Sequence, residues 1–131
     1  MKTIYVVEPD KMLQQTYVDA LSAKDRHIVT FRTANLAVRA LEKIMPDVVM
    51  LEIALPAHNG FEFLYELRSY ADTRNVCVVV NSFIQEESIP WGFVNRVDLG
   101  IVDYLYKPFA SPSDVQRAIA TALESSDDGI E

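Results

Sequence analysis

The sequence predicts an α/β domain built on a doubly wound, five-stranded parallel sheet with helices on both faces. Short apolar segments alternate along the chain with longer segments of helical periodicity. The strand segments are apolar almost throughout, which is typical of parallel strands covered on both faces. Right-handed crossovers between such strands place helices on both sides of the sheet.

Five segments are predicted to be strands because they are short, apolar and rich in valine, isoleucine and aromatic residues. They are residues 2–8, 27–33, 47–52, 75–82 and 100–106. In a parallel sheet the carboxyl ends of all strands lie at the same edge, where ligands and reaction sites are usually found.

Five segments are predicted to be helices because their apolar residues recur at intervals of three and four. They are residues 9–23, 35–45, 60–71, 89–99 and 111–125. Pro9 suits the first helical position, where a missing N–H costs nothing. Ser88 is the expected N-cap of the fourth helix, with Pro90 tolerated in its first turn. Ser111 or Ser113 is expected to cap the last helix.

Length and composition indicate one domain and exclude several classes of protein. A domain is expected over residues 1–125, followed by a polar, frayed tail at 126–131. The net charge of −7 argues against phosphate-mediated binding of nucleic acid. The single cysteine, Cys77, allows no disulfide framework within one chain. No apolar stretch approaches the roughly 20 residues of a membrane span. The apolar segment at the start is too short, and is followed too early by acidic residues, to be a signal peptide. A cytoplasmic location is therefore expected.

Polar side chains are concentrated where the predicted strands end. The first strand ends at Glu8, the third at Glu52, the fourth at Asn81 and Ser82, and the fifth just before Lys107. The common edge of a parallel sheet brings these groups together. We therefore expect a site that contains acids, an amide, a hydroxyl and one lysine.

The chain resembles the receiver domain of two-component response regulators over nearly all of its length. The resemblance is carried by "IYVVEPD", "PDVVMLEIALPAHNGFEFLYELR", "VVVNS" and "GIVDYLYKPF". The last is the most specific, because a strand is followed by Lys-Pro-Phe with an aromatic residue three positions before the lysine. Nearly as specific is the Leu-Pro pair with a following Asn59-Gly60 turn, whose glycine we expect at positive φ. The resemblance implies a flavodoxin-like receiver fold.

Three positions depart from the pattern of that family. In the family, two acids after the first strand bind magnesium, and an aspartate at the end of the third strand accepts a phosphoryl group. A Thr or Ser at the end of the fourth strand contacts the phosphoryl group, and a lysine after the fifth strand pairs with it. Glu8 and Lys107 match this pattern, whereas Pro9, Glu52 and Asn81 do not. The resemblance therefore implies a receiver that lacks three of the residues on which phosphorylation in the family depends.

Each departure has a physical consequence. Glu52 is one methylene longer than aspartate, and a misplaced nucleophile is costly in phosphoryl transfer. Magnesium demands near-octahedral oxygen ligands, so Glu8, Asp10 and Glu52 are only weak candidates, and Asp10 only if it turns into the site. The Asn81 amide could donate to a permanent anion. We expect no cofactor, no enzyme activity and a phosphorylation-independent interaction module in which Glu52 stands in for aspartyl phosphate.

Other interpretations remain open at this stage. Glu52 and Lys107 could form only a structural ion pair, or a relaxed site could still accept a phosphoryl group. A flavin- or nucleotide-binding domain of the same fold would need a glycine-rich loop after the first strand, and "VEPDKM" contains no glycine. The chain is expected to be either a single-domain regulator or a receiver cut from a longer protein.

The resemblance also implies a surface for partners, formed by the fourth helix, the fifth strand and the fifth helix. In the family, the groups at the positions of Asn81 and Tyr104 couple the site to this surface. Trp91, Tyr104 and Tyr106 are its candidate contact residues here, because aromatic residues dominate interface energetics. The expected occupant is a partner protein or a second copy of the chain, with no role for nucleic acid or membrane.

Overall fold

The computed structural model describes residues 1–56, 59–91 and 95–128, and it confirms the predicted fold class. Five parallel strands form one sheet in the order β2-β1-β3-β4-β5. The strands are β1 (Lys2–Val7), β2 (Arg26–Phe31), β3 (Val48–Leu51), β4 (Cys77–Ser82) and β5 (Ile101–Tyr106). The helices are α1 (Lys11–Leu21), α2 (Ala34–Ala40), α3 (Gly60–Ser69) and α4 (Pro112–Asp128), together with the 3-10 turn η1 (Glu86–Ser88).

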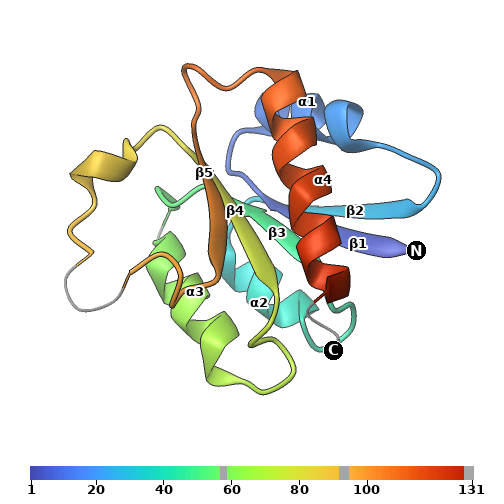
Figure 1. Ribbon diagram of the computed structural model, residues 1–131, viewed down its shortest axis with the longest axis vertical. Helices are drawn as coiled ribbons and strands as arrows, with labels where there is room; N and C mark the ends of the chain where they lie inside the picture. The colour runs from blue at the N-terminus through green and yellow to red at the C-terminus, as the bar shows by residue number, and fades with distance from the viewer. Residues whose placement is uncertain (57–58, 92–94, 129–131) are drawn as a thin grey trace.

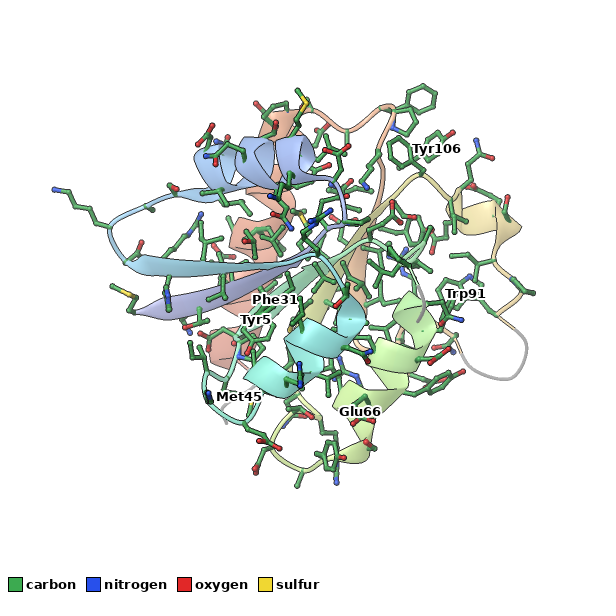
Figure 2. All side chains as sticks on the ribbon, turned by 180° about the vertical axis from the view of Figure 1, so that it is seen from behind. Tyr5, Phe31, Met45, Glu66, Trp91 and Tyr106 are labelled. Carbon is green, nitrogen blue, oxygen red and sulfur yellow. The ribbon has the colours of Figure 1, made fainter. Side chains whose placement is uncertain are left out.

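The sheet lies between two helical layers, with α1 and α4 on one face and α2 and α3 on the other (Figure 1). Side chains alternate between the two cores along β1: Tyr5 packs toward Phe31 under α2, and Ile4 packs toward α1 and α4 (Figure 2). Every residue of β3 is buried, as expected for a central parallel strand. No helix in the described part of the chain is long and apolar enough to cross a membrane.

The helix predicted at residues 89–99 is wrong where the structure describes that segment. Ile89 is extended, with φ −86° and ψ 123°, and residues 96–100 form turns. Pro90 explains the start of this difference, because a proline disfavours helical backbone in the residue before it. Ser88 therefore closes the short turn η1 instead of capping a helix, and residues 92–94 lie outside the described part of the chain.

Several helix ends differ from the sequence-based boundaries for local reasons. Helix α1 begins at Lys11, after Pro9, because the Asp10 carboxylate accepts hydrogen bonds from the backbone N–H groups of the first turn. At the start of α4, Ser111 is the cap, in a reciprocal pair with Asp114. Helix α4 continues to Asp128, so residues 126–128 of the expected tail are helical, while residues 129–131 lie outside the described part.

The prediction of a positive φ at Gly60 is wrong, because Gly60 is the first helical residue of α3. Asn59 is the N-cap, and its Oδ1 accepts a hydrogen bond of 3.0 Å from the Glu62 N–H. A Cβ at Gly60 would lie 2.7 Å from the Ile53 Cα. The glycine is therefore required by the close approach of two backbones, at the point where the chain leaves β3.

Arg68 binds the last residues before β5 to the residues before β4 through hydrogen bonds. Its guanidinium donates to the carbonyl of Leu99 at 2.9 Å, to that of Val76 at 2.6 Å and to that of Arg74. Burial lowers the pKa of this guanidinium. Gly100, with φ +77°, lies against it so closely that a Cβ would collide with the guanidinium group. The sequence therefore needs glycine here for two separate reasons.

We expect the substitution Gly100→Ala to lower the free energy of unfolding by about 2 kcal/mol or more, because alanine is strained at positive φ and its Cβ also collides with Arg68. Urea denaturation measures this loss. In the double variant Arg68→Ala, Gly100→Ala the collision is absent, so the loss should be smaller than the sum of the two single losses. Strictly additive losses would contradict a direct contact between the two positions.

Candidate functional site

Three strand ends bring two acids and a lysine into one buried cluster. The ammonium of Lys107, just after β5, lies 2.6 Å from Glu8 Oε1 and 2.7 Å from Glu52 Oε1. The three side chains are only 2–4% exposed. The carboxyl ends of β1, β3 and β5 therefore meet at an ion-pair cluster with two negative charges and one positive charge, at the edge of the sheet where the sequence predicts it.

The Glu52 carboxylate receives a full set of hydrogen bonds. In addition to Lys107, its donors are the backbone N–H of Ala54 at 3.0 Å, the backbone N–H of Phe83 at 3.2 Å and the hydroxyl of Ser82. An ionised carboxylate accepts about four hydrogen bonds. The surroundings of Glu52 are therefore complementary to a permanent anion.

Lys107 remains charged despite its burial. Burial by itself lowers the pKa of the Lys107 ammonium, but the hydrogen bonds and charges of Glu52 and Glu8 more than offset this, so the pKa lies above its ordinary value. The ring of Phe83 covers the cluster, with its centroid 4.5 Å from Lys107 Nζ. The sequence analysis did not include Phe83 in the site. Its position directly after β4 is the one feature of the sequence that could have placed it there.

The structure does not place Asn81 on the Glu52 carboxylate, although the sequence suggested its amide as a donor. The register of β3 and β4 pairs Leu51 with Val80, so Glu52 follows opposite Asn81. Glutamate is longer than aspartate, and its carboxylate contacts the next residues along, Ser82 and Phe83. Asn81 is buried, and its Oδ1 has no hydrogen-bond partner among the described residues.

Tyr17 of α1 lies close to this cluster and was also missed by sequence reasoning. Burial raises the pKa of its phenol, while the charge of Lys107 and a hydrogen bond with Asn81 lower it. The side chain is only 7% exposed. Tyr17 therefore lies beside the cluster, and it lines a hollow of about 250 Å³ together with Phe83 and Lys107.

The residues at this edge do not fit a magnesium ion. Asp10 is turned away from the site, because its Oδ1 accepts hydrogen bonds from the backbone N–H groups of Met12 at 2.8 Å and Leu13 at 3.1 Å. The ammonium of Lys107 contacts both remaining acids, Glu8 and Glu52. No group of three or more His, Cys, Asp or Glu side chains within residues 1–56, 59–91 and 95–128 could hold a metal ion.

A continuous path of hydrogen bonds leads from Glu52 to Tyr104 of β5. The hydroxyl of Ser82 donates to Glu52 and accepts from the backbone N–H of Ile84 at 3.0 Å. The phenol of Tyr104 donates to the carbonyl of the same Ile84 at 2.6 Å. Burial raises the pKa of Tyr104 to about 12. The state of the cluster is therefore linked to the position of the Tyr104 ring by directional bonds.

The three candidate contact residues are half-buried. Tyr104 uses its hydroxyl inside the protein, and Trp91 packs edge-on against Phe61 at 6.0 Å between ring centroids (Figure 2). Tyr106 packs edge-on against Phe109 at 5.2 Å, and Phe109 is 82% exposed. Phe109 therefore presents more aromatic surface to solvent than the residues that the sequence singled out.

The chain belongs to the family described as the response regulator receiver domain, whose model matches residues 4–120. It is therefore a receiver domain of two-component signalling. Among curated relatives, the KDP operon transcriptional regulatory protein KdpE of Escherichia coli is 28% identical over 123 residues, which is 94% of this chain and 52% of KdpE.

Solved receiver structures show the same fold. A response regulator receiver domain protein (CheY-like) from Methanospirillum hungatei has a TM-score of 0.83 at 18% identity, with 98% of each chain covered. The BeF3-activated DrrB receiver domain has a TM-score of 0.76 at 25% identity, with 95% of this chain and 98% of that chain covered. The chain spans only part of the length of its curated relatives. The matched region is 30% of a protein-glutamate methylesterase/protein-glutamine glutaminase of Oleidesulfovibrio alaskensis and 52% of KdpE.

We expect Lys107→Met to lower the free energy of unfolding by about 3–5 kcal/mol, because two buried carboxylates then face each other without a cation. Urea denaturation at neutral pH measures the loss. Glu52→Gln should cost less, because Lys107 keeps a one-to-one pair with Glu8. The matched control is Lys11→Met, an exposed lysine whose loss should change stability by about 0.5 kcal/mol at most. Equal losses at Lys107 and Lys11 would show that the buried cluster has no special role in stability.

The raised pKa of Tyr104 predicts a loss of stability in alkaline solution. Above a pH of about 10 the unfolded chain releases the phenol proton, whereas the folded chain keeps it until about 12. The contribution of Tyr104 is therefore complete below pH 10 and falls as the pH rises toward 12. Urea midpoints measured across this range should fall less steeply for Tyr104→Phe than for the unchanged protein. Parallel curves would contradict this assignment.

Proposed function

We propose that this receiver domain acts without phosphorylation, as a protein-interaction module in which Glu52 takes the place of aspartyl phosphate. The observation that supports this most directly is the full hydrogen-bonding of the Glu52 carboxylate by Lys107, Ser82 and two backbone N–H groups. In the family that the chain resembles, a lysine and a hydroxyl contact the phosphoryl group. Here a lysine and a hydroxyl contact a carboxylate that is always present.

The same contacts make Glu52 a poor phosphoryl acceptor. Its Oε1 contacts Lys107 and the Phe83 N–H, and its Oε2 contacts Ser82 and Ala54. An attack on a phosphodonor would have to break these bonds at Glu52, a residue that is only 3% exposed. Phosphoryl transfer also depends on neutralisation of the transferred charge, and the donor set at this edge does not suit magnesium. We therefore assign the domain no enzymatic step.

The path from Glu52 through Ser82 and Ile84 to Tyr104 supports a permanent link between the cluster and the partner surface. A two-state protein without a ligand to shift its populations remains in one dominant state. We infer that Glu52 holds the inward position of Tyr104, whose phenol bonds to Ile84. The module is then constant, and its output depends on which partner is present.

We place the partner surface on β5, the irregular segment before it and α4, as the family resemblance implies. Tyr106 and the exposed Phe109 are the contact residues that its geometry favours, with Trp91 at the margin next to Phe61. The occupant is a partner protein or a second copy of the chain. The acidic net charge of −7 does not favour nucleic acid.

We expect no stable phosphoryl group after incubation with a small phosphodonor and magnesium, because the Glu52 oxygens are engaged and the metal ligands are incomplete. Intact-mass spectrometry under non-acidic conditions measures the modification, with a conventional receiver domain as the positive control. A gain of one phosphate that maps to Glu52 and depends on magnesium would falsify the proposed function.

We expect one reversion to be insufficient for phosphorylation. Glu52→Asp restores the shorter acid but neither the second acid at position 9 nor a hydroxyl at position 81, so the single variant should stay essentially unmodified in the same assay. The triple variant Pro9→Asp, Glu52→Asp, Asn81→Thr should gain far more, because residues that act as a unit are non-additive. Equal phosphorylation of the single and triple variants would contradict this reasoning.

A further inference from the structure

A groove with an apolar floor runs between α2 and α3, on the face of the sheet opposite α1 and α4. Its central hollow has a volume of about 310 Å³ and is lined by Val38, Met45 and Tyr70, among others. Met45 is 42% exposed and Tyr70 is 54% exposed. Figure 2 shows Met45 beyond the end of α2 and Glu66 on α3, on the same side of the molecule.

Two further hollows extend the groove at its ends. One, of about 200 Å³, shares Val38 and Glu66 with the central hollow and lies toward the start of α2. The other, of about 320 Å³, shares Met45 and Asp72 with it and reaches the end of α4. The three hollows therefore adjoin one another at these shared lining residues. We treat this row of hollows as one candidate surface for a peptide segment.

The rim of the groove is acidic. Glu42, Glu66 and Asp72 line the central hollow, and none of the described residues that line the three hollows is basic. No described basic side chain forms an ion pair with these three carboxylates. The Tyr70 phenol donates to Glu66 Oε1 at 3.3 Å, so an aromatic ring and a carboxylate stand side by side. A lysine or arginine side chain would interact favourably with both.

We propose that this groove binds a basic amphipathic segment of a partner protein, with apolar side chains on the floor and lysine or arginine at the rim. Charge complementarity selects this occupant. A second copy of the chain would bring a net charge of −7 against the same acidic rim, which is unfavourable. The central hollow shares no lining residue with β5 or α4.

The test uses the full chain and a fluorescent peptide of about four helical turns, with leucine at positions i, i+3, i+4 and i+7 of one face and lysine elsewhere. Fluorescence anisotropy at low salt measures the dissociation constant. The rim variant Glu42→Gln, Glu66→Gln, Asp72→Asn should bind at least about tenfold more weakly. The matched variant Asp19→Asn, Asp25→Asn removes two negative charges from exposed sites outside both proposed surfaces and should change binding less than about twofold.

A second variant separates the floor from the rim. Met45→Ser keeps the charge and should also weaken binding several-fold, because it removes an apolar anchor. Circular dichroism shows whether each variant is folded, and amide resonances of the unchanged protein locate the peptide. Equal weakening in the rim and matched variants, the absence of saturable binding, or shifts confined to residues outside α2 and α3 would overturn the proposal. Self-association of the chain that is lost in Met45→Ser would also overturn it, because the groove would then be an interface between copies.

Discussion

The buried ammonium of Lys107 holds the carboxyl ends of β1, β3 and β5 together, and the rest of the site depends on it. Each of its two acid partners, Glu8 and Glu52, would be an uncompensated buried charge without it. Glu52 in turn fixes the residues after β4 through Ser82 and the Phe83 N–H. The ion-pair cluster is thus a structural element, and it also holds the Glu52 carboxylate in place.

Under the proposed function, this arrangement lets a receiver domain operate without a transient signal. A phosphoryl group changes a receiver because it appears and disappears, and a glutamate does neither. The bonds from Glu52 to Ser82, from Ser82 to Ile84 and from Ile84 to Tyr104 therefore favour one conformation at all times. On the same proposal, regulation comes from the availability of partners, and we propose an aromatic surface near Phe109 and an acidic groove between α2 and α3 as their sites.

The sheet and the ion-pair cluster could be predicted because they follow from local patterns and from one rule of topology. Short apolar segments predicted the strands. Parallel strands have their carboxyl ends at one edge of the sheet, which brings Glu8, Glu52 and Lys107 together. The sequence wrongly predicted a helix at 89–99, because the apolar spacing there is helical. The absence of a helix in the described part of this segment begins with a backbone constraint, the effect of Pro90 on Ile89.

The finer contacts of the site depend on distances that no local pattern contains. The length of the Glu52 side chain determines which side chain of β4 donates a hydrogen bond to it. That side chain is Ser82 and not Asn81. Gly60 is needed because two distant backbones approach each other, and Gly100 because Arg68 lies against it. Asp10 is the exception, since its capping of α1 is local and an acid just before a helix is a common N-cap.

The most direct test of the account is the amide spectrum of the isotope-labelled domain with and without magnesium and beryllofluoride, the ligand of the activated DrrB receiver domain. The amides of Ala54 and Phe83 donate to the Glu52 carboxylate and therefore report on this anion directly. If Glu52 already supplies the anion that the site is built to hold, these resonances and that of Lys107 should not move at saturating ligand. Saturable shifts at these amides would show that the site accepts an external phosphoryl analogue, and the account would be wrong.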